Sequence, residues 1–155
     1  MDVSGSPSYL LDTNITAYIV SGRSKLARRL LGETLARGPV TISTVTEAEI
    51  LYGLAIKPEA ARMRDAVEKL FQAIEIKAWD SAAARAYSTL RACLKRDGKN
   101  LAVADLLIAS QALSCGSILV THDKAFQHAA AYVQIEDWAT DLSEQPNRRG
   151  HTRTR

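Results

Sequence analysis

The sequence predicts an α/β fold: a three-layer α/β/α sandwich with a mainly parallel sheet of four to five strands. Two observations predict it. Short apolar runs alternate along the chain with longer helical segments, a pattern typical of parallel sheets that are covered on both faces. The chain also has 155 residues, 46% of them hydrophobic and 24% charged, which suits one domain with a substantial core.

The first strand and the polar residues after it begin this alternation. Tyr9-Leu10-Leu11 is a short apolar run, and Asp12-Thr13-Asn14 supplies capping groups for a short helix over residues 15–20. Ser21-Gly22 breaks that helix. The elements expected next are an amphipathic helix over residues 25–36 that Gly38-Pro39 stops, a strand over 40–42, a helix over 44–56, and a helix over 58–72 that opens on Pro58.

The second half of the chain continues the same pattern. Ile74-Glu75-Ile76 alternates and predicts a third strand near an edge of the sheet. Asp80 is placed to cap a long alanine-rich helix that ends at Asp97-Gly98. The remaining expected elements are a helix over 100–114 closed by Gly116, a strand over 118–120, a short helix after Asp123, and a weak fifth strand over 133–135.

We expect residues 1–140 to form a single domain and residues 141–155 to form a basic, disordered tail. The whole chain has a net charge of +3, but residues 146–155 contain four arginines and no acid, so the rest of the chain stands at −1. Bulk charge therefore does not make the body a nucleic-acid binder, whereas the tail could attract phosphate groups. No apolar run approaches the roughly 20 residues that span a bilayer. The N-terminus lacks the features of a signal peptide, so we expect a cytoplasmic protein that does not enter membranes.

Two acids follow strands directly. Asp12 comes immediately after the first strand, and Asp123 comes after the strand over residues 118–120, separated from it by Thr121 and His122. The carboxyl ends of parallel strands meet at one edge of the sheet, where open α/β sheets bind their ligands. Each acid alone could simply cap a helix, but their parallel placement favours a shared site.

Two further acids are interpreted from helical phase. On the helix over residues 44–56, Glu49 falls about 40° from the centre of an apolar stripe, while Glu47 falls roughly opposite and completes a Thr44-x-x-Glu47 capping box. Asp105 lies in the middle of the buried face of the later helix. A structural role remains open for both, because a core carboxylate can also cap a helix or pair with an arginine. The expected apolar stripes consist of Val45, Ala48, Tyr52 and Ile56 on the first helix and of Leu101, Ile108, Ala109 and Ala112 on the second.

A pocket of four carboxylates needs protons or a cation. Two carboxylates about 4 Å apart repel by roughly 4 kcal/mol at an effective dielectric near 20, and several such pairs rival a domain's stability of about 5–15 kcal/mol. Hard oxygen ligands without a His or Cys cluster favour Mg²⁺, with Mn²⁺ as a substitute, over Zn²⁺. Such a site suits phosphodiester hydrolysis, in which a metal ion activates water and shields developing charge.

Four motifs in this order resemble the PIN domain and, within that family, the VapC-type toxins of bacterial toxin–antitoxin pairs. The resemblance spans about residues 8 to 138. The matching segments are residues 10–14 (LLDTN), 42–53 (ISTVTEAEILYG), 105–113 (DLLIASQAL) and 118–126 (ILVTHDKAF), followed by a closing strand and Asp137-Trp138.

The resemblance implies a Mg²⁺- or Mn²⁺-dependent endoribonuclease that acts as a toxin on RNA. Asp12, Glu49, Asp105 and Asp123 match the family's acidic quartet, and Asn14 and Thr121 match polar residues that orient its carboxylates. It also implies a homodimer and a cognate antitoxin whose C-terminal segment covers the active site. His122 departs from the pattern, because related sequences often have another polar residue there. Nothing carries over to the basic tail.

Other functions stay open at this point. A phosphoacceptor signalling domain also uses an acidic Mg²⁺ pocket at strand ends, but it requires adjacent acids after the first strand, where this chain has Asp12-Thr13. A catalytically silent PIN-like module that only binds RNA or an antitoxin is the main alternative. Three cations that flank the motifs, Arg96, Lys99 and Lys124, could contact phosphates or be ordinary surface residues.

Overall fold

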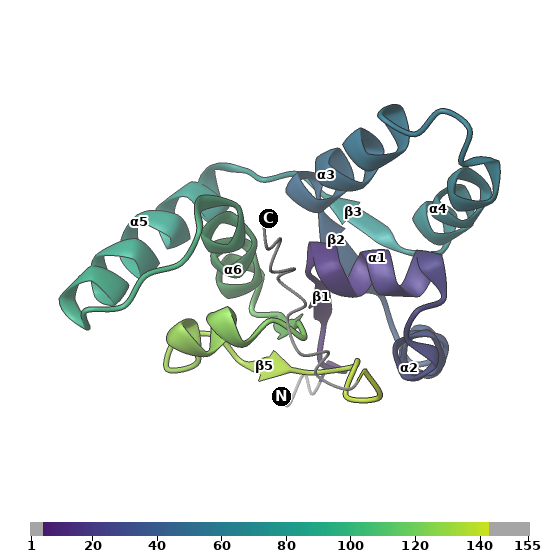
Figure 1. The fold of residues 1–155 in the computed structure, drawn as a ribbon. Coiled ribbons are helices and arrows are strands. Elements are labelled where there is room, and N and C mark those ends of the chain that lie inside the picture. The colour runs from purple at the N-terminus through teal and green to yellow at the C-terminus, as the bar shows by residue number, and fades with distance from the viewer. Residues whose placement is uncertain (1–4, 143–155) are drawn as a thin grey trace, which may run out of the picture.

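The sheet of the protein lies between two groups of helices in the computed structural model, which describes residues 5–142 (Figure 1). The strands are β1 (Tyr9–Leu11), β2 (Val40–Ser43), β3 (Glu75–Lys77), β4 (Ile118–Val120) and β5 (Ile135–Glu136). The helices are α1 (Thr13–Ser21), α2 (Lys25–Leu35), α3 (Thr44–Ala55), α4 (Ala61–Ala73), α5 (Ser81–Arg96), α6 (Val103–Cys115) and the 3₁₀ helix η1 (Lys124–Ala129).

All five strands are parallel, in the order β3-β2-β1-β4-β5. The predicted α/β/α sandwich with a parallel sheet is therefore confirmed, and β3 lies at an edge as expected. The chain fills one side of β1 with β2 and β3 before it crosses to β4 on the other side. Such a reversal of strand order opens a crevice at the carboxyl ends of the two strands concerned. Here those strands are β1 and β4.

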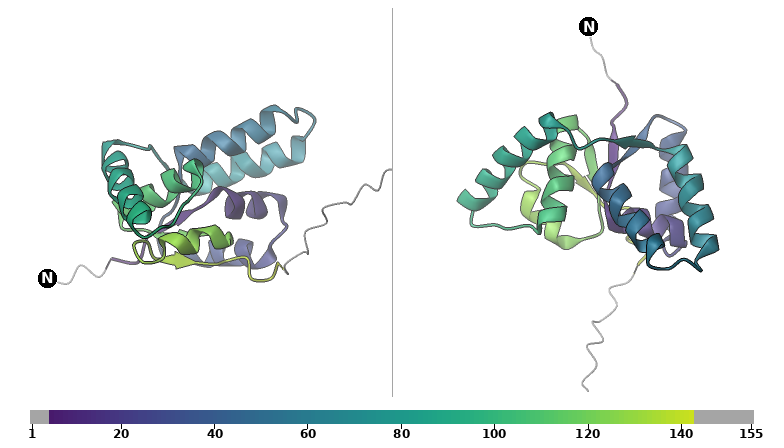
Figure 2. Two further views of the ribbon diagram at one scale, coloured as in Figure 1. Left: turned by 60° about the vertical axis from the view of Figure 1, so that its left-hand side comes forward. Right: turned by 90° about the horizontal axis from the view of Figure 1, so that it is seen from above.

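Successive residues of β1 pack into opposite layers. Leu11 joins a core with α1, α2, α3 and α4, whereas Leu10 joins a core with α5, α6 and η1, and both side chains are fully buried. The two views of Figure 2 show the same separation of helices across the sheet. Because a side chain on either face meets a helix layer, the strand is apolar at both positions instead of alternating.

Several element boundaries differ from the sequence expectation. The helix expected from Pro58 begins at Ala61, because the backbone first makes a turn in which Ala60 N–H donates to Lys57 O over 3.0 Å. The third strand starts one residue later than expected, at Glu75, and the fifth is Ile135–Glu136 instead of residues 133–135. Ends of short strands are set by pairing with a neighbour, which an isolated pattern of three residues does not specify.

The rotation of α3 was predicted wrongly. Tyr52 and Ile56, placed on the buried face by the sequence, are 67% and 59% exposed. The side chains that α3 buries are those of Thr46, Ile50 and Leu54. The expected capping box is also absent: Ser43 caps the helix by accepting from Val45 N–H at 3.0 Å, and Thr44 Oγ1 instead accepts from Trp79 N–H at 3.2 Å. This helix carries apolar residues on two faces, so its periodicity fits either rotation.

The last described residues hold α2 in place. Asp141 accepts from Ser24 Oγ at 2.6 Å and from Leu26 N–H at 3.2 Å, next to the N-terminus of α2. The rest of the predicted basic tail, residues 143–155, lies outside the described residues. Within residues 5–142, none of the helices combines the length and the apolar character needed to cross a lipid bilayer.

Candidate active site

Asp12 lies at the centre of the carboxyl edge of the sheet. β1 ends at Leu11, which pairs with Ile42 on one side and Val120 on the other, and Asp12 N–H extends this ladder by donating to Val120 O at 3.0 Å. Its carboxylate caps α1, with Oδ1 accepting from Ile15 N–H at 2.8 Å. The residue is only 2% exposed. One strand end and one helix start therefore fix this carboxylate in a buried position.

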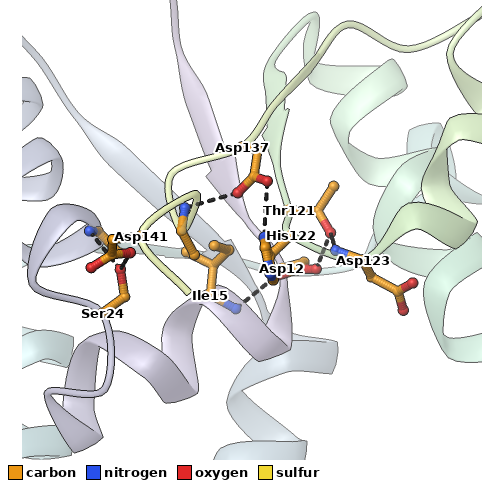
Figure 3. A network of polar contacts seen from close by, with 10 residues as sticks. Asp12, Ile15, Ser24, Thr121, His122, Asp123, Asp137 and Asp141 are labelled. Carbon is orange, nitrogen blue, oxygen red and sulfur yellow. Dashed lines mark hydrogen bonds and ion pairs between the residues drawn. The ribbon is translucent and has the colours of Figure 1, made fainter. Parts of the chain in front are cut away.

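Thr121 connects Asp12 to Asp123. The Thr121 hydroxyl donates to Asp12 Oδ2 at 2.5 Å, and its oxygen accepts from Asp123 N–H at 3.0 Å (Figure 3). Asp123 in turn caps η1 by accepting from Ala125 N–H at 2.9 Å. The Thr121 hydroxyl therefore orients the Asp12 carboxylate, and its predicted role beside a metal ion stays a prediction. Both acids therefore cap a helix, one of the two alternatives that the sequence left open, and their sharing of a metal site stays a prediction.

The electrostatics of Asp12 reflect burial and its acidic neighbours. Burial raises the pKa of Asp12 from 3.8 to about 6, against the hydrogen bonds from Thr121 and Ile15, which favour the ionised form. The charges of Asp105 and Asp123 contribute to this raised pKa as well, but less than burial does. The buried carboxylate therefore costs the metal-free protein stability near neutral pH, and a cation at this edge would relieve that cost.

Asp105 and Glu49 reach the same region from two helices. Asp105 is half-buried in the first turn of α6, and burial raises its pKa, with further contributions from Asp123 and Glu49. Ile108, Ala109 and Ala112 of α6 are buried as predicted, and so is Leu101, which lies just before the helix. Glu49 is exposed on α3, so the helical-phase reason for singling it out was wrong. Its electrostatic effect on Asp105 nevertheless places it near the other acids.

In the described part of the chain, the four predicted acids do not form a ready-made cage for a metal ion. Among residues 5–142, no three His, Cys, Asp or Glu side chains are grouped tightly enough to enclose a metal ion. Mg²⁺ typically takes one or two carboxylates directly and keeps several waters. The hard oxygen donors and the raised pKa values of Asp12 and Asp105 both suit such an ion.

Asn14 and His122 have different surroundings from those expected of a metal site. The Asn14 side chain is exposed and makes no hydrogen bond within the described chain, so its predicted orienting role stays a prediction. The His122 ring pairs through Nδ1 with Asp137 Oδ2 at 2.9 Å and meets the Tyr18 ring edge-on, with centroids 6.3 Å apart. Asp137 was not selected from the sequence. Side chains alternate along the extended segment after β4, so His122 points away from Thr121 and Asp123. This alternation could have predicted that His122 has a partner outside the acidic site.

An apolar groove opens beside this edge between α1, α3 and α4. It encloses about 430 Å³ and is lined by Thr13 and Glu49 at one side and by Ile50, Leu54 and Val67 along its floor. A hydrogen bond of 3.2 Å between Thr13 Oγ1 and Thr46 Oγ1 joins α1 to α3. Among the four predicted acids, Glu49 is the one that lines this groove, which continues over the apolar core.

Comparison with known proteins identifies this architecture. The PIN domain family matches residues 9–132. Among curated relatives, the tRNA(fMet)-specific endonuclease VapC of Shigella flexneri is 30% identical, over 84% of this chain and 98% of that protein. Ribonuclease VapC1 of Haemophilus influenzae is 29% identical, over 84% of this chain and 97% of its own length.

Solved structures show the same fold. VapBC2 from Rickettsia felis, bound to a DNA fragment from its promoter, superposes with a TM-score of 0.78 at 25% identity, over 84% of this chain and 98% of that chain. DNA-bound VapBC from Salmonella typhimurium gives a TM-score of 0.76 at 28% identity, over 85% of this chain and 98% of that chain. Both coverages are high, so the likeness extends over nearly the whole described domain.

Proposed function

Because the chain belongs to the PIN-domain family, and within it to the VapC-type toxins, we propose that it is a Mg²⁺-dependent endoribonuclease that acts as the toxin of a toxin–antitoxin pair. Mn²⁺ is expected to substitute for Mg²⁺. The observation that carries the proposal is the mutual effect of the acids: Asp12 is influenced by Asp105 and Asp123, and Asp105 by Asp123 and Glu49. This coupling supports one shared site for carboxylates that are far apart in the sequence.

We assign the direct metal contacts first to Asp12 and Asp105, with Glu49 and Asp123 completing the site directly or through water. When bound, the metal ion lowers the pKa of a water molecule and offsets the charge that develops on the phosphate. Thr121 holds the Asp12 carboxylate in one orientation through its hydroxyl, and the N–H of Ile15 fixes the other oxygen. The chain's own contribution is thus to preorganise the carboxylates at the edge of the sheet.

A cognate antitoxin is the proposed protein partner. The solved relatives are VapBC complexes, and the groove between α1, α3 and α4 offers an apolar floor beside Glu49. Arg23 and Lys57 line the same groove. A segment with apolar side chains and at least one acid would match it and would cover the acidic site at its end. In this arrangement the antitoxin blocks RNA from the metal site.

A homodimer is also part of the proposal. Leu51, Tyr52 and Ile56 form an exposed apolar face on α3, with exposed fractions from 47% to 67%. A contiguous apolar face of this kind is typical of a protein interface. We expect a second copy of the chain to cover it, which size-exclusion chromatography with light scattering would test. A toxin that acts on cellular RNA also implies a location in the cytoplasm.

RNA cleavage by the purified full-length protein tests the activity. We expect cleavage of total RNA with Mg²⁺ or Mn²⁺, loss of cleavage in EDTA, and recovery when excess Mg²⁺ is added. Asp105→Asn should lower the rate by at least about a hundredfold, since it removes a proposed metal contact while leaving the fold intact. Asp65→Asn, an exposed acid on α4, serves as the matched control and should cleave like the unmodified protein.

The same experiment separates the enzyme from a silent binding module. A protein that binds RNA with unchanged affinity in EDTA and never cleaves it would contradict the proposal. Cleavage that persists in EDTA would also contradict it, because the four carboxylates would then have no metal-dependent role. Mapping of the cleaved ends on total RNA would identify the target.

A further inference from the structure

A second cavity lies between α5 and the segment over residues 97–102 that leads into α6. It encloses about 620 Å³, more than the groove beside the acidic site. Arg91, Lys95 and Lys99 line it, and no acidic residue does. The acid in the adjacent turn, Asp97, instead accepts a hydrogen bond from the Tyr132 hydroxyl. The cavity therefore concentrates three positive charges.

The positions of these cations are set by the fold. Arg91 and Lys95 are four residues apart on α5 and so share one face of the helix. The Arg91 guanidinium donates to the Tyr87 hydroxyl at 3.0 Å and lies 5.8 Å from the centroid of that ring. Lys99 is brought back by the turn at Gly98, which has a φ of 67°, and its N–H donates to Leu94 O at 2.8 Å. Like charges at this spacing repel each other, so an anionic ligand bound between them would reduce the repulsion.

The cavity is close to the acidic site along α6. Val103 and Leu106 of the first turn of α6 line it, and Leu106 directly follows Asp105. Figure 1 shows α5 and α6 side by side, with the connecting segment leading back to the start of α6. Asp105 and the cavity thus lie on different faces of the same helical turn. A polymer that reaches both has to pass over the N-terminal end of α6.

We propose that this cavity binds phosphate groups of the RNA strand next to the phosphate that is cleaved. The proposal rests on the proposed function, because it needs an RNA strand at the acidic site. The carboxylates at that site repel RNA, so attraction has to come from elsewhere on the surface. Arginine and lysine supply it through charge-assisted hydrogen bonds to phosphate oxygens, without reading the base sequence. Of the cations singled out in the sequence, Lys99 lines the cavity, whereas Arg96 contacts Cys93 Sγ.

Binding of a short fluorescent single-stranded RNA, measured by anisotropy at several salt concentrations, tests this proposal. All proteins carry Asp105→Asn, so that the probe is not cleaved. The test protein adds Arg91→Ala, Lys95→Ala and Lys99→Ala. The matched control adds Lys25→Ala, Arg62→Ala and Lys69→Ala, which remove the same charge from exposed positions on α2 and α4. Circular dichroism melting checks that both remain folded.

We expect the test protein to bind RNA at least about tenfold more weakly at low salt. The slope of log affinity against log salt should fall by about two, since each lost phosphate contact removes about 0.7 for a single strand. The control protein should show a much smaller loss of RNA affinity and a much smaller change in the salt slope. Equal losses in test and control proteins would overturn the proposal, since bulk charge alone would explain them. Weaker binding of a DNA duplex with unchanged RNA binding would overturn it as well.

Cleavage assays with proteins that retain Asp105 distinguish a failure of the proposed function from a failure of the cavity proposal. Failure of the unmodified protein to cleave RNA with Mg²⁺ would contradict the proposed function. If the unmodified protein cleaves and the cavity variant cleaves with the same KM, only the cavity proposal fails. A higher KM with nearly unchanged kcat is the expected result, because the cavity contributes to binding of the strand away from the reacting phosphate.

Discussion

Ionisation of Asp12 should destabilise the metal-free protein as the pH rises from about 4 to about 6. The pKa of Asp12 is about 6 in the fold and 3.8 in an exposed carboxyl, chiefly because the group is buried. Within that window the folded state binds a proton that the unfolded state has lost, so raising the pH favours unfolding. One pKa unit corresponds to about 1.4 kcal/mol, so the free energy of unfolding falls by about 3 kcal/mol and then stays constant above pH 7 or so.

The variant Asp12→Asn isolates this effect. Asn Oδ1 can still accept from Ile15 N–H, but its amide group cannot accept the proton that Thr121 now donates. Loss of that hydrogen bond costs about 1 kcal/mol. The variant should therefore be about 1 kcal/mol less stable than the unmodified protein near pH 4 and about 2 kcal/mol more stable near pH 8. Titrating groups remote from Asp12 contribute equally to both proteins and cancel in the difference, whereas Asp105 and Asp123, whose charges act on Asp12, add a smaller change of their own.

Urea unfolding in EDTA, followed by circular dichroism at several pH values, measures this difference. A difference that stays constant within about 0.5 kcal/mol from pH 4 to pH 8 would refute the reasoning, because a buried carboxyl with a raised pKa must produce a change. Mg²⁺ provides a second check. At a concentration about a hundred times its Kd, it should stabilise the unmodified protein by about 2.7 kcal/mol. It should stabilise Asp12→Asn much less.

Two further substitutions test parts of the structure around this site. Thr121→Val removes the hydroxyl that donates to Asp12 and accepts from Asp123 N–H. The affinity for Mg²⁺, measured by calorimetry, should therefore fall about 10- to 100-fold. An unchanged affinity would rule out an orienting role for Thr121. Leu119→Ala leaves a cavity at a fully buried position on β4. The free energy of unfolding in urea should fall by about 2–5 kcal/mol. A fall of less than about 1 kcal/mol would contradict the packing described for that face of the sheet.

The sequence predicted best the features that depend on the sheet as a whole. Alternation of strands and helices predicted the parallel sheet, and the rule for strand ends predicted that Asp12 and the residues after β4 would meet. The register bears this out, since Leu11 pairs with Val120 and Thr121 then reaches Asp12. Such features survive small errors in element boundaries, because a parallel sheet brings all its carboxyl ends to one edge whichever residue ends each strand.

Features that depend on choosing between two apolar faces were not predictable in the same way. On α6 the predicted choice was right for Ile108, Ala109 and Ala112, which are buried, although Ser110 and Gln111 are buried too and Asp105 is only half-buried. On α3 it was not: Ile50 and Leu54 face the core, while Tyr52, about 160° around the helix from Ile50 at 100° per residue, is exposed. An interface to another chain selects the same residue types as a core. A single sequence does not distinguish the two.

The ambiguity in the rotation of α3 bears directly on Glu49. It was singled out because it lay near a stripe that proved to be the exposed face, so helical phase no longer supports it. At 100° per residue, it lies about 100° from Ile50, at the border between the buried side of α3 and the groove that it lines. That border is where a carboxylate can remain hydrated and still raise the pKa of Asp105. The assignment of Glu49 to the site therefore now depends on electrostatic coupling between two helices, and Glu49→Gln should lower the pKa of Asp105 in the metal-free protein, whereas a carboxylate remote from the site would leave it unchanged.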